Sequence, residues 1–130
     1  HLMFGAQTTD ASVTSSTLNN TTDSYFTVPE NTIMYFHANI VAVRVAGTGA
    51  GSRGDFASYV ERGVVINKSG TVSVSREVEA VKSSGTVSGW ATTVSTTGGQ
   101  LLVNVQGATD VTVEWCSDMV LTQIKTGVSL

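Results

Sequence analysis

The sequence predicts an all-β fold, a small antiparallel β-sandwich, and three observations lead to it. Ser and Thr make up about a quarter of the 130 residues, whereas charged residues make up only 13%. Thr and Val favour the pleated, half-buried surface of a strand over a helix. Short apolar runs alternate with turn-forming residues along most of the chain, as in strands joined by hairpins. A chain of this length has room for one domain with its own core.

The first 23 residues differ from the remainder of the chain. The segment from Gln7 to Asp23 is polar and rich in Ser, Thr and Asn, with one short strand expected at Ala11–Thr14. We therefore expect residues 1–23 to form an arm or linker and residues 24–130 to form the sandwich. No signal peptide is indicated, because His1–Phe4 has no basic segment ahead of an apolar one.

Seven strands are expected after this arm, separated by turns. In Thr71–Lys82, for example, Val72 and Val74 lie on one side and Ser73 lies on the other, and Arg76 breaks the apolar side. The expected strands are Ser24–Val28, Thr32–Val45, Phe56–Asn67, Thr71–Lys82, Gly89–Thr96, Leu101–Gln106 and Val111–Lys125. The expected turns are Pro29–Asn31, Lys68–Gly70, Ser83–Gly85, Thr97–Gly99 and Gly107–Asp110, whose residue types suit hairpin connections.

The expected strand Thr32–Val45 is apolar on both of its faces. A sandwich of two sheets buries only one face of each strand, so the second face needs another cover. In a domain this small we expect that cover to be another subunit. The residues expected at this subunit interface are Met34, Phe36, Ala38 and Ile40.

A glycine-rich segment follows this strand. It contains Gly49-x-Gly51-x-x-Gly54, the spacing of a dinucleotide-binding turn. Such a turn needs a following helix whose N-terminus holds the pyrophosphate, and no later segment has helical periodicity. We therefore expect a mobile loop between two antiparallel strands, whose sequence matters little to folding. The same loop contains Arg53-Gly54-Asp55, a tripeptide that integrins recognise, and we interpret this match as a coincidence.

Residues with a catalytic or metal-binding pattern are not found, so we expect no enzymatic activity, no cofactor and no metal. Glu77 and Glu79 lie two residues apart on one strand, as on a solvated edge. His37 is expected to be a hydrogen-bonded core or interface histidine, and the single Cys116 a buried thiol. The net charge of −3 with scattered basic residues gives no basis for nucleic-acid binding, and no apolar run is long enough to span a membrane.

If the domain binds a ligand, the glycine-rich loop and its neighbourhood offer the best side chains. They combine guanidinium donors, a carboxylate acceptor and an aromatic face, which suits an anionic ligand or a sugar: Arg53, Asp55, Tyr59 and Arg62. Trp90 opens a strand after Gly89, so it is either a rim residue that stacks on a sugar or a core residue.

The order of several segments resembles the C-terminal β-domains of tail fibres, tailspikes and tail needles of tailed bacteriophages. The segments are Ala6–Ala11, Val28–Thr32, Phe36–Arg44, Tyr59–Ile66, Gly89–Trp90, Gly99–Val105 and Thr112–Trp115. The resemblance covers nearly the whole chain from Gly5. It implies a jelly-roll sandwich that forms a homotrimer at the end of a fibrous shaft on the virion, with the N-terminal arm joining that shaft. It also implies contact with a glycan or protein of the host surface.

Two other functions stay open from the sequence. The first is a carbohydrate-binding module of a larger secreted or virion hydrolase, with Trp90 as the sugar platform. The second is a hydrolytic or self-cleaving tailspike fragment, for which Ser117-Asp118 is the corresponding dipeptide.

Overall fold

The computed structural model describes all 130 residues and consists of two antiparallel sheets packed as a sandwich. The larger sheet has six strands in the order β3–β1–β10–β5–β6–β7. In chain order these strands are β1 (Leu2–Thr8), β3 (Thr17–Leu18), β5 (Thr32–Gly47), β6 (Phe56–Lys68), β7 (Thr71–Ser84) and β10 (Val111–Lys125). No helix long and apolar enough to span a bilayer is present.

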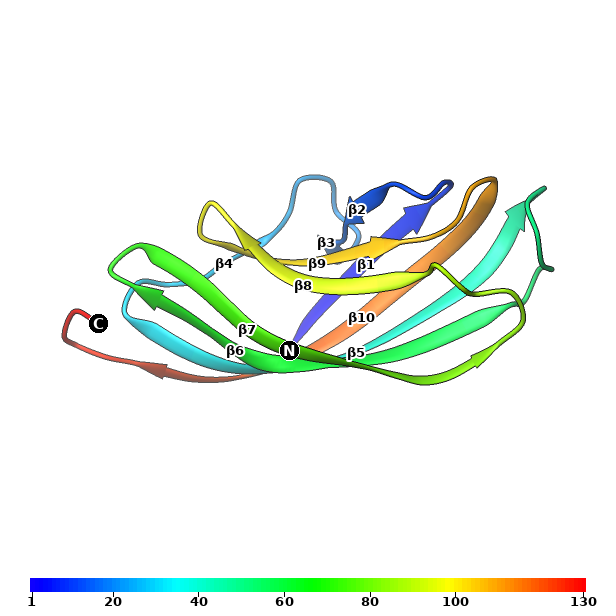
Figure 1. Cartoon of the computed structure of the whole chain (residues 1–130). Coiled ribbons are helices and arrows are strands. Elements are labelled where there is room, and N and C mark those ends of the chain that lie inside the picture. The colour runs from blue at the N-terminus through cyan, green and yellow to red at the C-terminus, as the bar shows by residue number, and fades with distance from the viewer.

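The smaller sheet has four strands arranged around β9 (Gln100–Gln106). One side of β9 pairs along its whole length with β8 (Ala91–Thr97). Two short strands, β2 (Val13–Ser15) and β4 (Phe26–Thr27), also pair with β9, toward its opposite ends. Figure 1 shows the smaller sheet covering the concave side of the strongly curved larger sheet, whose ends project beyond it.

The expected fold class is confirmed, and each of the seven strands expected after the arm corresponds to one strand from β4 to β10. Two of the expected turns have a clear stereochemical basis. Ser69 and Gly70 both have positive φ, as do Gly98 and Gly99. Each pair forms the two-residue connection of a hairpin, in which positive φ at both positions matches the twist of the flanking strands.

The N-terminal segment differs from the expected arm. Leu2–Thr8 is a full strand of the larger sheet and pairs with β10 from Leu2↔Met119 to Thr8↔Val113. Phe4 and Ala6 are buried in the core. Thr8 accepts a hydrogen bond of 3.0 Å from the indole nitrogen of Trp115. The first eight residues are therefore part of the sandwich, because alternate apolar side chains fill its interior.

The core lies between the sheets and contains 19 buried apolar residues. It also holds one carboxylate, that of Glu61, whose burial the sequence did not reveal. The carboxylate of Glu61, which is 0% exposed, lies 2.7 Å from the Nε of Arg76 and accepts a hydrogen bond of 3.2 Å from the backbone N–H of Val94. Arg76 was the break in the apolar side of its strand, and Glu61 on the neighbouring strand β6 is its partner.

Candidate interaction surface

β5 has one face in the core and one face in solvent, and the two faces alternate along the strand. Ile40 is 2% exposed, whereas Val41 beside it is 53% exposed. The interface expected from the sequence is corrected here, because the residues assigned to it are buried inside a single chain: Met34, Phe36, Ala38 and Ile40. A second chain has no access to these side chains, so only the opposite face of β5 is free for a contact.

That opposite face belongs to the outer surface of the larger sheet, which faces away from the smaller sheet. Thirteen large apolar residues of the chain are exposed, and nine of them point outward from this sheet or line a groove on it. We call these nine residues the outer apolar patch: Met3, Tyr35, Val41, Val43, Phe56, Val64, Val81, Val120 and Ile124. They come from β1, β5, β6, β7 and β10, so the patch spans most of the sheet.

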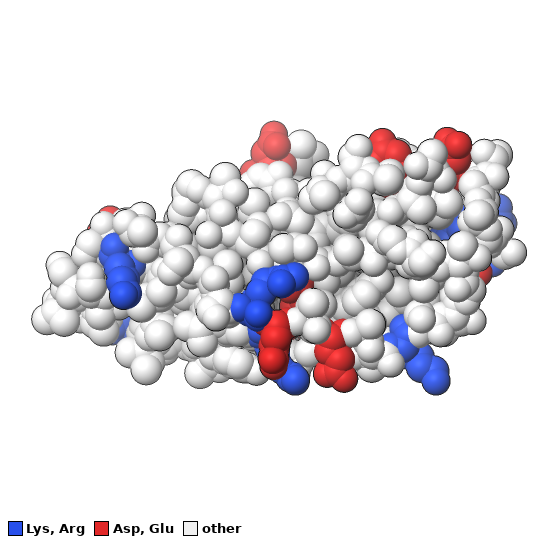
Figure 2. Space-filling model, in the orientation of Figure 1, with Lys and Arg blue, Asp and Glu red and all other residues white.

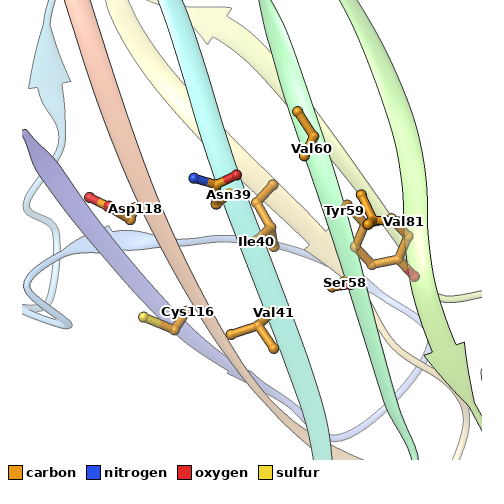
Figure 3. A pocket seen from close by; sticks show the side chains of 9 residues that line it. All are labelled: Asn39, Ile40, Val41, Ser58, Tyr59, Val60, Val81, Cys116 and Asp118. Carbon is orange, nitrogen blue, oxygen red and sulfur yellow. The ribbon is translucent and has the colours of Figure 1, made fainter.

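A groove of about 360 Å³ lies within this surface. Figure 3 shows that its lining side chains come from β10, β5, β6 and β7, with Val41, Val60 and Val81 on one side and Cys116 and Asp118 on the other. The groove is mainly apolar. Cys116 is exposed at its border rather than buried as expected, because it lies on the outward positions of β10.

Some of the charged side chains of the outer surface form ion pairs within the chain. Arg62 lies 2.5 Å from a carboxylate oxygen of Glu77 and 3.9 Å from one of Glu79. The hydrogen bond to Glu77 is the main reason that the pKa of Arg62 is raised. On the same surface, the ring of His1 lies 3.1 Å from a carboxylate oxygen of Asp118 on β10. Figure 2, a view of the molecule from one side, likewise shows few charged side chains, with basic and acidic ones adjacent near the centre.

His37 lies on the outer surface in register with Arg62 on β6 and Val120 on β10. Its Nε2 atom is buried and has no hydrogen-bond partner in the chain. The sequence led us to expect a hydrogen-bonded histidine, and the structure places its ring nitrogen without such a bond. Buried polar atoms are rarely left unsatisfied in native proteins, but this atom is enclosed by its own chain, so a second molecule has no direct access to it.

The glycine-rich loop is held in place by one buried arginine, contrary to the expectation of a free, mobile loop. Arg44, which is 4% exposed, donates hydrogen bonds to the carbonyl oxygens of Ala46, Gly47, Gly49 and Ala50 at 2.5–3.2 Å. A planar guanidinium has five N–H donors in a fixed arrangement, which allows one side chain to bind several carbonyls. The loop therefore depends on Arg44 for its shape.

Asp55 closes the same loop. One of its carboxylate oxygens accepts hydrogen bonds from the backbone N–H groups of Ser52 at 2.8 Å and Thr86 at 3.2 Å. Gly85 has a φ of 88°, and a side chain there would meet the carboxylate of Asp55. The loop contains no helix and joins the antiparallel strands β5 and β6, so it lacks the helix N-terminus of a dinucleotide site. Arg53 lies in the same loop, and its side chain is exposed.

Tyr59 of β6 and Trp90, which directly precedes β8, lie in contact with each other and with Trp115. The hydroxyl of Tyr59 donates to the carbonyl oxygen of Trp90 at 3.3 Å, and its ring stacks on Trp115 with centroids 6.4 Å apart. Burial raises the pKa of Tyr59. Trp90 is 6% exposed and packs against Trp115, so its ring is a core element and leaves no exposed face on which a sugar can stack.

The five residues expected to bind a ligand therefore fall into three places. Arg53 and Asp55 lie in the loop, Tyr59 and Trp90 lie at the aromatic cluster with Trp115, and Arg62 lies on the outer surface. The structure does not bring them into one pocket. The outer apolar patch was missed as a unit, although its signal was present in the apolar character of both faces of Thr32–Val45.

Comparisons with known proteins find distant similarity in structure but no match in sequence. No protein-family model matches the chain, and no curated protein matches it. The tailspike protein of the Acinetobacter baumannii phage AM24 is similar in structure, with 13% sequence identity and a TM-score of 0.43. The similarity covers 96% of this chain and 27% of the tailspike chain, so this chain spans about a quarter of the length of that protein.

Proposed function

We propose that the chain is the distal domain of a bacteriophage tail appendage, a fibre, spike or needle. In this proposal it forms a homotrimer that stabilises the end of the appendage and contacts the host cell surface, and it has a binding and assembly role rather than a catalytic one. Two lines of support come from the chain itself. The order of its segments resembles such domains from Gly5 onward, and its fold is the antiparallel sandwich that this resemblance implies.

The observation that carries the proposal is the outer apolar patch. Single apolar residues are normal on a protein surface, but many exposed apolar residues on one face of a sheet are typical of an interface. Here the patch runs over five strands, and Arg62 beside it is paired with Glu77 and Glu79 of the same chain. An assembled appendage would cover such a surface.

Contact with the host would involve the end of the sandwich that carries the glycine-rich loop. Arg53 is the residue of the loop that supports this view, because it is exposed and makes no ion pair within the chain. Asp55, Tyr59 and Trp90 are engaged in internal contacts. An unpaired guanidinium suits an anionic group of a surface glycan or protein.

Binding to bacterial cells tests the host-contact part. The fluorescently tagged protein would be incubated with a panel of bacterial strains, and we expect saturable binding to a subset that unlabelled protein competes away. Arg53→Ala should weaken this binding, whereas Lys125→Ala should not, because Lys125 lies at the opposite end of β5 and β10. Equal binding by both variants would remove the loop from the contact, and an absence of binding to every strain would reject host contact by this domain.

A further inference from the structure

A second groove lies at the end of the sandwich that carries the glycine-rich loop. It has a volume of about 540 Å³ and is lined by residues 57–59 of β6, residues 80–83 of the edge strand β7 and residues 87–90 of the connection from β7 to β8. Figure 1 shows this connection and the glycine-rich loop at the same end of the molecule. We call this site the edge groove.

The edge groove is preformed, because the connection from β7 to β8 is anchored toward both of its ends. The backbone N–H of Thr86 donates a hydrogen bond of 3.2 Å to the carboxylate of Asp55. The hydroxyl of Tyr59 donates to the carbonyl oxygen of Trp90 at 3.3 Å, and the N–H of Trp90 donates to that of Val87 at 3.1 Å. Small-molecule sites are usually preformed and have volumes of about 300–1,000 Å³, a range that includes this groove.

The lining combines apolar surface with hydroxyl groups. Val87 and Tyr59 pack against the core and are half-buried, whereas Ser83 and Ser88 are exposed. Burial raises the pKa of Tyr59, so its hydroxyl stays neutral, and the oxygen keeps the capacity to accept a hydrogen bond. A sugar ring presents both C–H faces and hydroxyl groups, and a lining of this kind suits it.

The charge at the groove is positive. Lys82 is the only charged residue of the lining, and it forms no ion pair within the chain. A register shift in the pairing of β6 with β7 leaves Val81 without a partner, directly before Lys82. Such bulges at sheet edges redirect the neighbouring side chains. An unpaired ammonium group beside hydroxyls and apolar surface favours a ligand with a negative charge.

We propose that the edge groove binds a sugar residue that carries a carboxylate or a phosphate, with Lys82 as the partner of the negative charge. This inference rests on the host-contact part of the proposed function and specifies its site and its class of ligand. The ring packs against the apolar lining at Val87, its hydroxyl groups bond to Ser83 and Ser88, and its anionic group meets Lys82.

Backbone amide chemical shifts test the inference, because they report both affinity and position. The isotope-labelled protein would be titrated through the millimolar range with glucuronic acid, galacturonic acid and glucose 1-phosphate, and with glucose and galactose as neutral counterparts. We expect at least one charged sugar to shift the amide signals of the edge groove with an affinity about tenfold or more above that of its neutral counterpart, because hydrogen bonds to charged groups are the stronger ones. The carboxylate and phosphate sugars distinguish the two sources of the charge.

Two variants locate the contact. Lys82→Gln should remove the preference for the charged sugar, whereas Lys68→Gln should keep it, because Lys68 lies at the opposite end of β6. Ala80→Trp places a large side chain at an exposed position of the lining and should abolish binding. Its control is Ser73→Trp, at an exposed position near the other end of β7. The dispersion of the amide signals would verify that each variant is folded.

The inference is overturned if no charged sugar binds better than its neutral counterpart, if the shifts fall outside the edge groove, or if Lys82→Gln binds like the parent. The bacterial binding assay separates this result from the proposed function. Strains that bind the parent, Lys82→Gln and Ala80→Trp equally would uphold host contact and reject the groove as its site. A charged sugar that binds in the groove of a protein that binds no strain would uphold the groove and reject host contact.

Discussion

Two arginine side chains, the buried Arg44 and the partly exposed Arg76, have partners of different kinds within the chain. Arg44 binds a set of backbone carbonyl oxygens at the end of the sandwich, while Arg76 pairs with the buried carboxylate of Glu61 between the sheets. Burying a charge is costly unless it is paired and hydrogen-bonded. We therefore expect the stability of the fold to fall when the interactions of either arginine are removed.

Removing the carboxylate of Glu61 should destabilise the fold strongly. In Glu61→Ala, Arg76 would lose its counter-charge and the backbone N–H of Val94 its acceptor, and we expect a loss of about 3 kcal/mol in the free energy of unfolding. Urea unfolding at a fixed protein concentration measures this loss. Glu79→Ala is the control and should change stability by less than about 0.5 kcal/mol, because its ion pair is exposed. Equal effects of the two substitutions would refute the structural role of Glu61.

Only part of this pair could be predicted from the sequence. Arg76 was visible as a charged residue on the apolar side of an alternating strand. Its partner could not be identified, because the pairing of Arg76 with Glu61 depends on the register between β6 and β7 and on the cover of β8. Trp90 was ambiguous for a similar reason, since its burial depends on contact with Trp115 from a distant part of the chain.

At the scale of elements, the strands could be predicted from alternating side chains, as in β5, and from the turn-forming residues between the strands. The expected strand boundaries lie within two residues of the observed ones, because glycine, proline and asparagine separate the apolar runs. β1 was missed because Phe4 and Ala6 lie beside a polar segment and form too short a pattern to separate from it. The choice between the two apolar faces of β5 was wrong because alternation defines two faces but does not tell which one meets the other sheet.

The glycine-rich loop is an element whose stability depends on one side chain. Arg44→Met keeps a long side chain but removes every donor to the loop carbonyls, and we expect a loss of about 2 kcal/mol, or roughly 5–10 °C in melting temperature. Differential scanning fluorimetry measures the shift. Arg53→Met in the same loop is the control and should melt like the parent, because Arg53 is exposed. If the loop were mobile and mattered little to folding, both variants would melt at the same temperature as the parent.

At the scale of the whole molecule, the smaller sheet covers one face of the larger sheet, and the other face is exposed to solvent. The core residues are buried between the two sheets of the single chain, whereas no part of that chain covers the outer apolar patch. The sequence indicated that another subunit was needed, from the apolar character of both faces of one strand. The extent of the patch became visible only when the fold placed β1, β10, β5, β6 and β7 side by side.

The accessibility of Cys116 tests the covered outer face most directly. The chain has a single cysteine, and its thiol lies on this face at the border of the groove, exposed in the isolated chain. The rate of its reaction with a thiol reagent would be measured under native conditions for the parent and for Val64→Glu. If a second copy covers the face, Cys116 should react about tenfold or more slowly in the parent than in Val64→Glu. The added carboxylate should prevent the contact in the variant, whereas the parent must dissociate before its thiol can react. Equal rates in the two proteins would contradict the account.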